Sequence, residues 1–458
     1  MKFKIFFIDK KNYSILFLLT IPVILNFLIS FSEEFKFAII KNFLGNLPLT
    51  ILFFFFFVLI GFNIKNIFKF QTISFSIATF FMILFVLDNV FLFLTRYLSF
   101  KQLANIYLFI FLIIFLYRQF KIKNLRIANL FLVAFYLFFQ KFNNSFYLGK
   151  DLFTSDESRL WIPATTFIYE NNYFFSLKNI SIEGYGLLPA YIKAFLTSIF
   201  NYSSFVYNPV ISNLFLLLFL LMVIETFSKV SSKIYIILLF ISIFFTNDWL
   251  NYIFFNSLLG EGPSSFVFST IIIEIMKSKN KISNFPVVLL AFNIYGKNFL
   301  TIISLLLIIF LYVKFKNKKN ILIFLMPLSV TYLNYIIFDI SYLWKFYFEF
   351  NSGYGKNNFV AINNLNLLIR EFLVDKTMSI LFLSLFTLWI FSKNKINKIL
   401  SLDHLNENIL YLNIFIVVSI FILLVEEGGY IGDSYRYLVS TLFLIPSIFS
   451  NYLEQKLY

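Results

Sequence analysis

Long apolar segments alternate with short polar ones from one end of the chain to the other. A helix needs about 20 mainly apolar residues to cross roughly 30 Å of hydrocarbon. Apolar windows fall at 13–31, 47–64, 71–94, 103–117, 127–140, 206–227, 234–246, 263–276, 285–296, 299–313, 321–338, 378–392, 409–425 and 438–454. Some windows are short, so the pattern predicts about 12 to 14 spans. It favours an all-α, polytopic transmembrane helical bundle over a barrel, whose strands would alternate apolar and polar residues.

The composition agrees with a membrane protein and narrows the possible chemistry. Of the 458 residues, 60% are hydrophobic and 13% are charged, which is more apolar than a soluble domain needs to be. The chain has no Cys and a single His, His404. This excludes disulfides, thiolate nucleophiles and most schemes that use His as a base or metal ligand. Any chemistry must therefore use carboxylates, Lys, Arg, Tyr or a metal held by carboxylates.

The basic residues predict the orientation of the bundle. Lys and Arg gather in alternate short connections, and such loops are retained on the cytoplasmic side. These connections are 118–126, 228–233, 277–281, 314–320 and 393–398. Both termini are then cytoplasmic, and two long loops, 141–205 and 339–377, are extracytoplasmic. The net charge of +15 is explained by basic loops that meet an anionic leaflet, so no nucleic-acid partner is expected.

This topology brings the unusual polar clusters of the chain to the same outer face. The clusters contain Asp156 and Glu157 in TSDESRLWIP, Glu261 in GEGP, Lys297 in GKN, and Arg436 and Tyr437 at the end of EEGGYIGDSYRY. The basic-loop rule makes no use of these clusters. Because all of these clusters nevertheless fall on the outer face, they support a single outer site.

Each cluster also has an ordinary structural explanation. Asp156 and Glu157 would stabilise the first turn of a helix capped by Ser155, where the helix dipole favours carboxylates. Pro163 would either kink that helix or begin the next one. Glu261 could simply open a helix.

The basic residues of these clusters can be explained in the same way. Lys297 could extend to the membrane interface, and Arg436 with Tyr437 could form an anchor pair at the membrane edge.

A further helix is expected in the first outer loop, beginning at Pro189. One of its faces is apolar, with Leu188, Ile192, Phe195, Leu196 and Ile199 at helical spacing. Such a helix is expected to lie along the membrane surface and cover an outer site. The alternative is a segment that only re-enters the membrane before the span at 206–227.

These motifs together resemble the GT-C superfamily of integral membrane glycosyltransferases. The shared pattern is an outer-loop Asp-Glu pair followed by Trp, Pro and an Ile-Tyr-Glu helix, then a juxtamembrane helix, a Gly-Glu-x-Pro turn, a Lys-Asn pair and a late Arg-Tyr. It assigns residues 127–458 to a GT-C-like region and residues 1–126 to an N-terminal region of about four spans. In many members the acidic loop follows the first span. Either the first four spans are an addition here, or the correspondence fails.

The resemblance implies transfer of a sugar from a polyprenyl-phosphate carrier to a glycan, lipid or protein acceptor of the cell envelope, at the outer face of a bacterial inner membrane. Asp156 is the first choice for the carboxylate that orients or deprotonates the acceptor, and Glu157 is the second. Lys297 and Arg436 would bind the carrier phosphate.

The remaining substrate-binding assignments follow from the same resemblance. Tyr437 is assigned to the substrate-binding residues together with Lys297 and Arg436. Glu261 would position substrate or, with Asp156, hold a divalent cation. The sequence does not identify a cofactor, and no residue is assigned as a metal ligand. The reaction as described requires no nucleotide.

Two other functions remain open. A transporter or flippase of lipid-linked glycans would carry ionisable residues near the middle of its spans, whereas Asp88, Glu225 and Glu274 lie toward span ends. An O-antigen-type polymerase or ligase would use the same outer site and is poorly separated from a transferase by sequence.

Overall fold

The computed structural model describes residues 34–119, 126–140, 161–179, 187–200, 210–226, 261–277, 284–293, 304, 308 and 319–340. At several helix ends only the backbone is described. The α-helices are α2 (Glu34–Phe68), α3 (Ile73–Val90), α4 (Phe100–Gln119), α5 (Arg126–Gln140), α6 (Ile162–Glu170), α7 (Tyr173–Asn179), α8 (Leu188–Ile199), α9 (Val210–Thr226), α12 (Glu261–Lys277), α13 (Asn284–Phe292) and α15 (Lys319–Phe338), with a 3₁₀ turn η1 (Leu94–Arg96). These ranges contain no strand, which confirms the all-α prediction for the part of the chain they cover.

Among the described residues, three helices are long and apolar enough to cross a membrane. They are Gly45–Phe68 within α2, Ile73–Val90 and Phe100–Tyr117. They coincide with the apolar windows at 47–64, 71–94 and 103–117. Helices α5, α9, α12, α13 and α15 fall in the windows at 127–140, 206–227, 263–276, 285–296 and 321–338. The windows at 13–31, 234–246, 378–392, 409–425 and 438–454, and nearly all of 299–313, lie outside the described residues.

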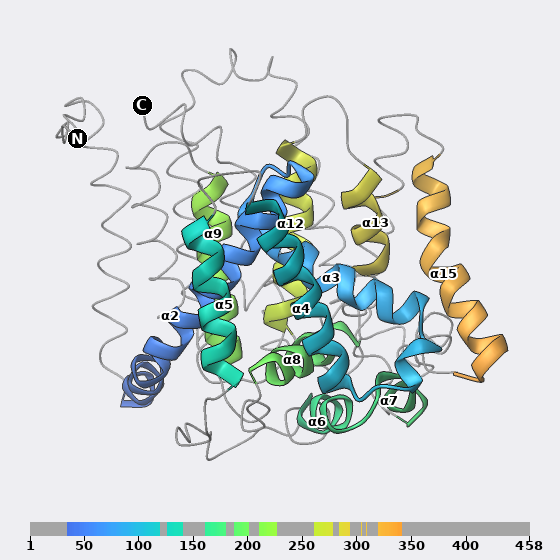
Figure 1. Cartoon of the computed structure of the whole chain (residues 1–458), viewed down its shortest axis with the longest axis horizontal. Coiled ribbons are helices and arrows are strands. Elements are labelled where there is room, and N and C mark those ends of the chain that lie inside the picture. Colours follow the sequence, from blue (N-terminus) through green and yellow to red (C-terminus); the bar gives the residue numbers. More distant parts are fainter. Residues whose placement is uncertain are drawn as a thin grey trace, which may run out of the picture.

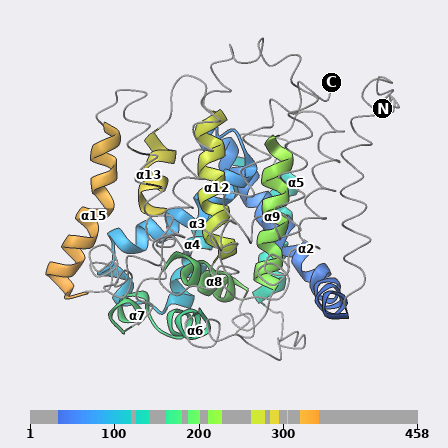
Figure 2. The same cartoon turned by 180° about the vertical axis from the view of Figure 1, so that it is seen from behind.

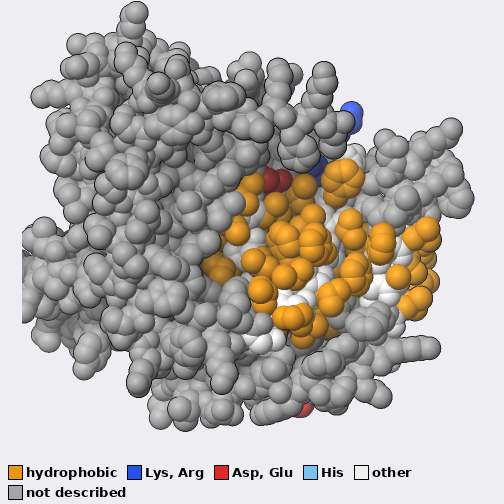
Figure 3. Space-filling view, turned by 90° about the vertical axis from the view of Figure 1, so that its left-hand side faces the viewer, with side chains coloured by type: hydrophobic (Ala, Val, Ile, Leu, Met, Phe, Trp, Pro, Cys, Tyr) orange, Lys and Arg blue, Asp and Glu red, His pale blue; other side chains and the backbone are white. Residues whose placement is uncertain are grey.

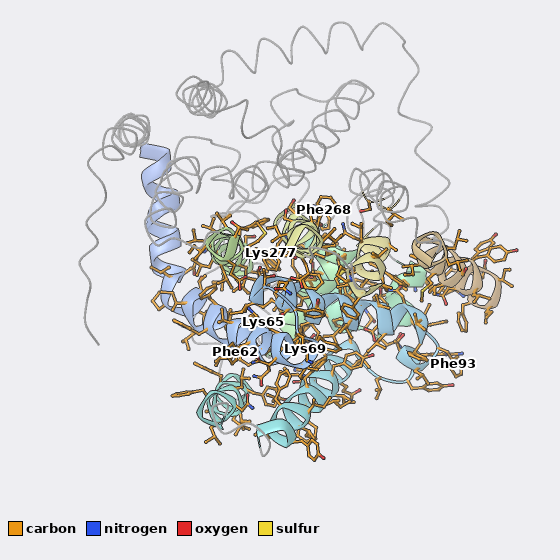
Figure 4. The ribbon with its side chains drawn as sticks, turned by 90° about the horizontal axis from the view of Figure 1, so that it is seen from above. Phe62, Lys65, Lys69, Phe93, Phe268 and Lys277 are labelled. Carbon is orange, nitrogen blue, oxygen red and sulfur yellow. The ribbon has the colours of Figure 1, made fainter. Side chains whose placement is uncertain are left out.

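The helix ends gather into two groups at opposite ends of the described bundle (Figures 1 and 2). At one end, the short helices α6, α7 and α8 lie across the ends of the longer ones; we call this the α8 end. At the other end, the turn between α2 and α3 meets the last turns of α9 and α12; we call this the clamp end. The chain therefore runs toward the clamp end in α2, α9 and α12 and away from it in α3. Lys65, Lys69 and Lys277 belong to the clamp end (Figure 4).

Aromatic side chains fill the interior between the long helices. Phe53 of α2 stacks on Phe200, at the end of α8, with ring centroids 3.9 Å apart. Phe80 and Phe81 of α3 contact Phe195 of α8 edge-on. The edge-to-face geometry of the latter pairs is one of the arrangements that aromatic rings prefer. The high Phe content thus supplies the core as well as the outer surface.

A glycine permits α2 and α3 to approach closely. A Cβ built on Gly61 would lie 2.6 Å from the Ile77 side chain and 2.9 Å from both the side chain and the carbonyl oxygen of Ile73. No larger residue fits without moving one helix. Small residues allow the same close approach where helices pack in membranes.

An apolar surface covers one side of the described bundle. On α4 the exposed side chains recur at helical spacing, at Ile106, Phe109, Ile110, Ile113, Ile114 and Tyr117. Figure 3 shows a continuous hydrophobic surface, with acidic and basic side chains only at its edges. Its composition matches that of a surface that faces lipid hydrocarbon.

The short helices begin where proline predicts. Pro163 lies in the first turn of α6 and Pro189 in the first turn of α8. Whether Pro163 also kinks an earlier helix depends on residues 151–160, which lie outside the described residues. The α8 helix differs from the surface helix expected from its apolar face, because every residue from Leu188 to Phe200 is buried. It packs against α4, α6 and α12 and is enclosed on both faces.

Candidate functional site

A buried aspartate joins three helices at the α8 end. Asp88 is fully enclosed near the end of α3. Its Oδ1 accepts a hydrogen bond from the Tyr107 hydroxyl of α4, and its Oδ2 accepts one of 2.6 Å from the Tyr191 hydroxyl of α8. Both oxygens thus have a hydroxyl donor, which is what a buried carboxyl group requires.

The neighbouring asparagine extends this network to two more helices. Asn89 Nδ2 donates to the Tyr173 hydroxyl of α7 at 3.1 Å and to the Phe85 carbonyl oxygen at 2.8 Å. Asn334 of α15 donates to the Asn89 carbonyl oxygen at 3.0 Å. The rings of Tyr173 and Tyr191 meet edge-on, with centroids 5.3 Å apart. The end of α3 is therefore the point to which α4, α7, α8 and α15 attach.

This geometry gives Asp88 a positioning role. A general base needs a carboxylate oxygen within reach of the proton that it removes. Both Asp88 oxygens instead bind the two tyrosines that orient α4 and α8. The aspartate fixes the short helices relative to the long ones.

A buried cation lies between α6 and α8. Lys193 of α8 is only 3% exposed. Its Nζ lies 5.9 Å from the centroid of the Trp161 ring, which immediately precedes α6. Trp161 is 1% exposed, and its indole Nε1 has no hydrogen-bond partner. The Thr165 hydroxyl, one turn further along α6, is also buried without a partner.

Of the residues assigned from the sequence, Glu261 is the one within the described ranges. It is the first residue of α12, and only its backbone is described. The other end of α12 is at the clamp end, where Lys277 donates to the Glu225 carbonyl oxygen at 2.7 Å. Since α12 also contacts α8, Glu261 lies toward the α8 end. Its position agrees equally with the ordinary explanation that it opens a helix.

The remaining assigned residues lie outside the described part of the chain. These are Asp156, Glu157, Lys297, Arg436 and Tyr437. Their roles stay predictions. The described residues that sequence reasoning did not single out are Lys193, Trp161 and the partners of Asp88. One signal for Lys193 was present, because a lysine inside a helix this apolar needs an explanation.

The two other span-end carboxylates have a structural task at the clamp end. Glu225 of α9 accepts from the backbone N–H groups of Ile73 at 2.6 Å and Ser74 at 2.9 Å. Glu274 of α12 accepts from the Gln71 N–H at 2.8 Å. Both carboxylates therefore bind the start of α3, where a helix leaves its first N–H groups without partners. These contacts favour a structural role over ion coupling.

Over the part of the chain that the structure describes, fold and site define an all-helical protein with three helices long and apolar enough to cross a membrane and a buried polar network beneath short helices at one end. Within the described ranges, no group of three or more His, Asp or Glu side chains is arranged to hold a metal ion. The chain matches no family model, no curated protein and no solved structure.

Proposed function

We propose that this protein is a multi-spanning glycosyltransferase of a bacterial inner membrane, with both termini in the cytoplasm. It transfers a sugar from a polyprenyl-phosphate carrier to a glycan, lipid or protein acceptor of the envelope. The observation that carries the proposal is the α8 end. There, three short helices cover the ends of apolar helices, and a buried cation and unsatisfied hydrogen-bond donors lie among them. A site of this kind suits a substrate with a lipid tail and a polar head.

Chain connectivity supports a place for the acidic pair near this end. Glu157 precedes Trp161 by four residues in the sequence. Four residues extend no further than about 14 Å, so Glu157 stays within that distance of Trp161 in any conformation. Glu261, at the start of α12, lies toward the same end.

The proposed chemistry needs few groups. The carrier phosphate is already a competent leaving group, so the enzyme has to activate the acceptor and hold the phosphate. Asp156 orients or deprotonates the acceptor hydroxyl or amide, with Glu157 beside it. Lys297 attracts the phosphate as a point charge, and Arg436 binds it through two parallel N–H groups.

The test replaces Asp156 with Asn, which keeps the size of the side chain and removes its charge. Transfer from a polyprenyl-phosphate sugar should fall by about two orders of magnitude or more, because a positioned base contributes roughly 10² to 10⁴ in rate. Glu157→Gln should lower the rate of sugar transfer less than Asp156→Asn does. The first readout is the amount of envelope glycan in cells, measured together with protein abundance.

Asp151→Asn is the matched control, since it removes a carboxylate from the same loop. It should keep wild-type glycan levels. Normal glycan in Asp156→Asn at normal protein abundance would show that Asp156 only caps a helix. Loss of a single dipole interaction should cost about 0.3 to 1 kcal/mol, so Asp156→Asn is expected to fold.

A further inference from the structure

The contact between α6 and α8 contains more hydrogen-bond donors than it uses. The Trp161 indole N–H and the Thr165 hydroxyl are both buried, and neither has a hydrogen-bond partner. Leaving a buried donor unsatisfied costs roughly 1 to 3 kcal/mol, so a ligand that accepts hydrogen bonds from both groups would recover this energy. Trp161 and Thr165 are four residues apart, which puts them on the same face of the helix.

A positive charge accompanies these donors. Lys193 Nζ lies 5.9 Å from the Trp161 ring centroid, near the outer limit for a cation–π contact. An N–H donor, a hydroxyl and an ammonium group share one chemical preference, an oxyanion with several acceptor atoms. A phosphate fits this set better than a neutral hydroxyl or a cation.

We infer that the contact between α6 and α8 binds a phosphate group through Trp161 Nε1, the Thr165 hydroxyl and Lys193. The phosphate is that of the polyprenyl carrier, so these three groups would hold it in addition to the Lys297 and Arg436 of the proposed function, on which the inference rests in this respect. The apolar helices that surround the α8 end would accommodate the polyprenyl chain. The site is separate from the Asp88 network, whose carboxylate oxygens are both occupied.

The experiment measures the binding of three probes to the full-length protein in lipid nanodiscs. The probes are a polyprenyl monophosphate, the corresponding polyprenol without phosphate, and inorganic phosphate. The variants Trp161→Phe, Thr165→Val and Lys193→Gln each remove one group and keep most of the side-chain volume. Each should weaken polyprenyl monophosphate binding by about 10- to 100-fold, as expected for a hydrogen bond to a charged group. Polyprenol binding should not change.

Two controls separate binding from folding. Thr79→Val also removes a buried hydroxyl without a partner, but in the middle of α3, and Lys178→Gln removes an exposed lysine from α7. Both should bind polyprenyl monophosphate as the wild type does. Thermal unfolding identifies any variant that fails to fold, and Thr165→Val is the mildest change.

The outcomes separate this inference from the proposed function. Wild-type affinity in all three folded variants would refute the site and leave the proposed function standing. Intact phosphate binding without sugar transfer would refute the proposed function alone. A wild-type protein that binds neither polyprenyl monophosphate nor inorganic phosphate would refute both. If inorganic phosphate binds and the three variants weaken it, the phosphate site is supported and free phosphate is its source.

Discussion

At the scale of single residues, Asp88 shows how one buried carboxyl group organises distant parts of the chain. Its two tyrosine partners lie 19 and 103 residues away in the sequence. Burying a carboxyl group is unfavourable unless its oxygens are satisfied, so the three side chains depend on one another. Removing one tyrosine hydroxyl leaves an oxygen of Asp88 without a partner, which costs more than the loss of an exposed hydrogen bond.

Tyr191→Phe is therefore expected to lower the free energy of unfolding by about 1 to 3 kcal/mol. Thermal unfolding of the purified protein in detergent measures the change. Tyr97→Phe is the matched control, because Tyr97 is 68% exposed, and its effect should stay within about 0.5 kcal/mol. Equal unfolding temperatures for the two variants would show that the bond between Tyr191 and Asp88 contributes nothing.

At the scale of elements, the start of α3 is held by two other helices. Thr72 caps α3 through its own side chain, which accepts from the Phe75 N–H at 3.2 Å. The carboxylates of Glu225 and Glu274 bind three further backbone N–H groups at this end. Negative charge is favourable at the positive end of a helix dipole. The same contacts fix the turn between α2 and α3, where Lys69 has a positive φ of 58°.

Glu225→Ala should loosen this end of α3. It removes the acceptors of two hydrogen bonds, and since each is worth roughly 1 to 3 kcal/mol, the free energy of unfolding should fall by about 2 to 6 kcal/mol. Trypsin should then cleave after Lys65 and Lys69 faster than in the wild type, because local opening exposes the turn. Glu225→Gln keeps one acceptor oxygen, so its rate of cleavage should lie between those of the wild type and Glu225→Ala.

The control for this prediction is Glu170→Ala, which removes an exposed carboxylate at the end of α6. Its cleavage rate should match that of the wild type. If Glu225→Ala is also cleaved at the wild-type rate, the two carboxylates do not hold the turn.

At the scale of the whole molecule, the described helices extend between two ends, and the basic loops predict which end faces the cytoplasm. The clamp end carries Lys65, Lys69 and Lys277 (Figure 4), and Lys277 begins the basic connection 277–281, which the sequence pattern assigns to the cytoplasmic side. The α8 end belongs to the first long outer loop. The proposed function requires this orientation, because the carrier presents its sugar on the extracytoplasmic face.

Single cysteines test the orientation cleanly, since the natural chain has none. Cysteines in place of Lys150 and Gly355 should react with a membrane-impermeant thiol reagent in intact cells once the reagent has crossed any outer membrane. Cysteines in place of Ile122 and Asn317 should react only after the inner membrane is opened. The reverse pattern would put the acidic pair in the cytoplasm and remove the basis for a polyprenyl-phosphate donor.

The sequence by itself determined the properties that depend on neighbouring residues. Apolar runs gave the helices, and the spans at 47–64, 71–94 and 103–117 were recognisable because crossing hydrocarbon requires a continuous apolar segment. Pro163 and Pro189 gave the starts of α6 and α8, because proline lacks the N–H that the first helical turn leaves unused.

Only the tertiary structure decided how these helices use their polar groups. The bond between Asp88 and Tyr191 joins residues 103 positions apart, and the one between Gln71 and Glu274 joins residues 203 apart. No local pattern encodes such pairs, since they arise from which helices become neighbours. The enclosure of α8 has the same cause. Its apolar face alone predicted a surface helix, whereas α4, α6 and α12 pack against it and bury both faces, Lys193 included, because the neighbours of a helix are set by the packing of the whole chain and not by its own sequence.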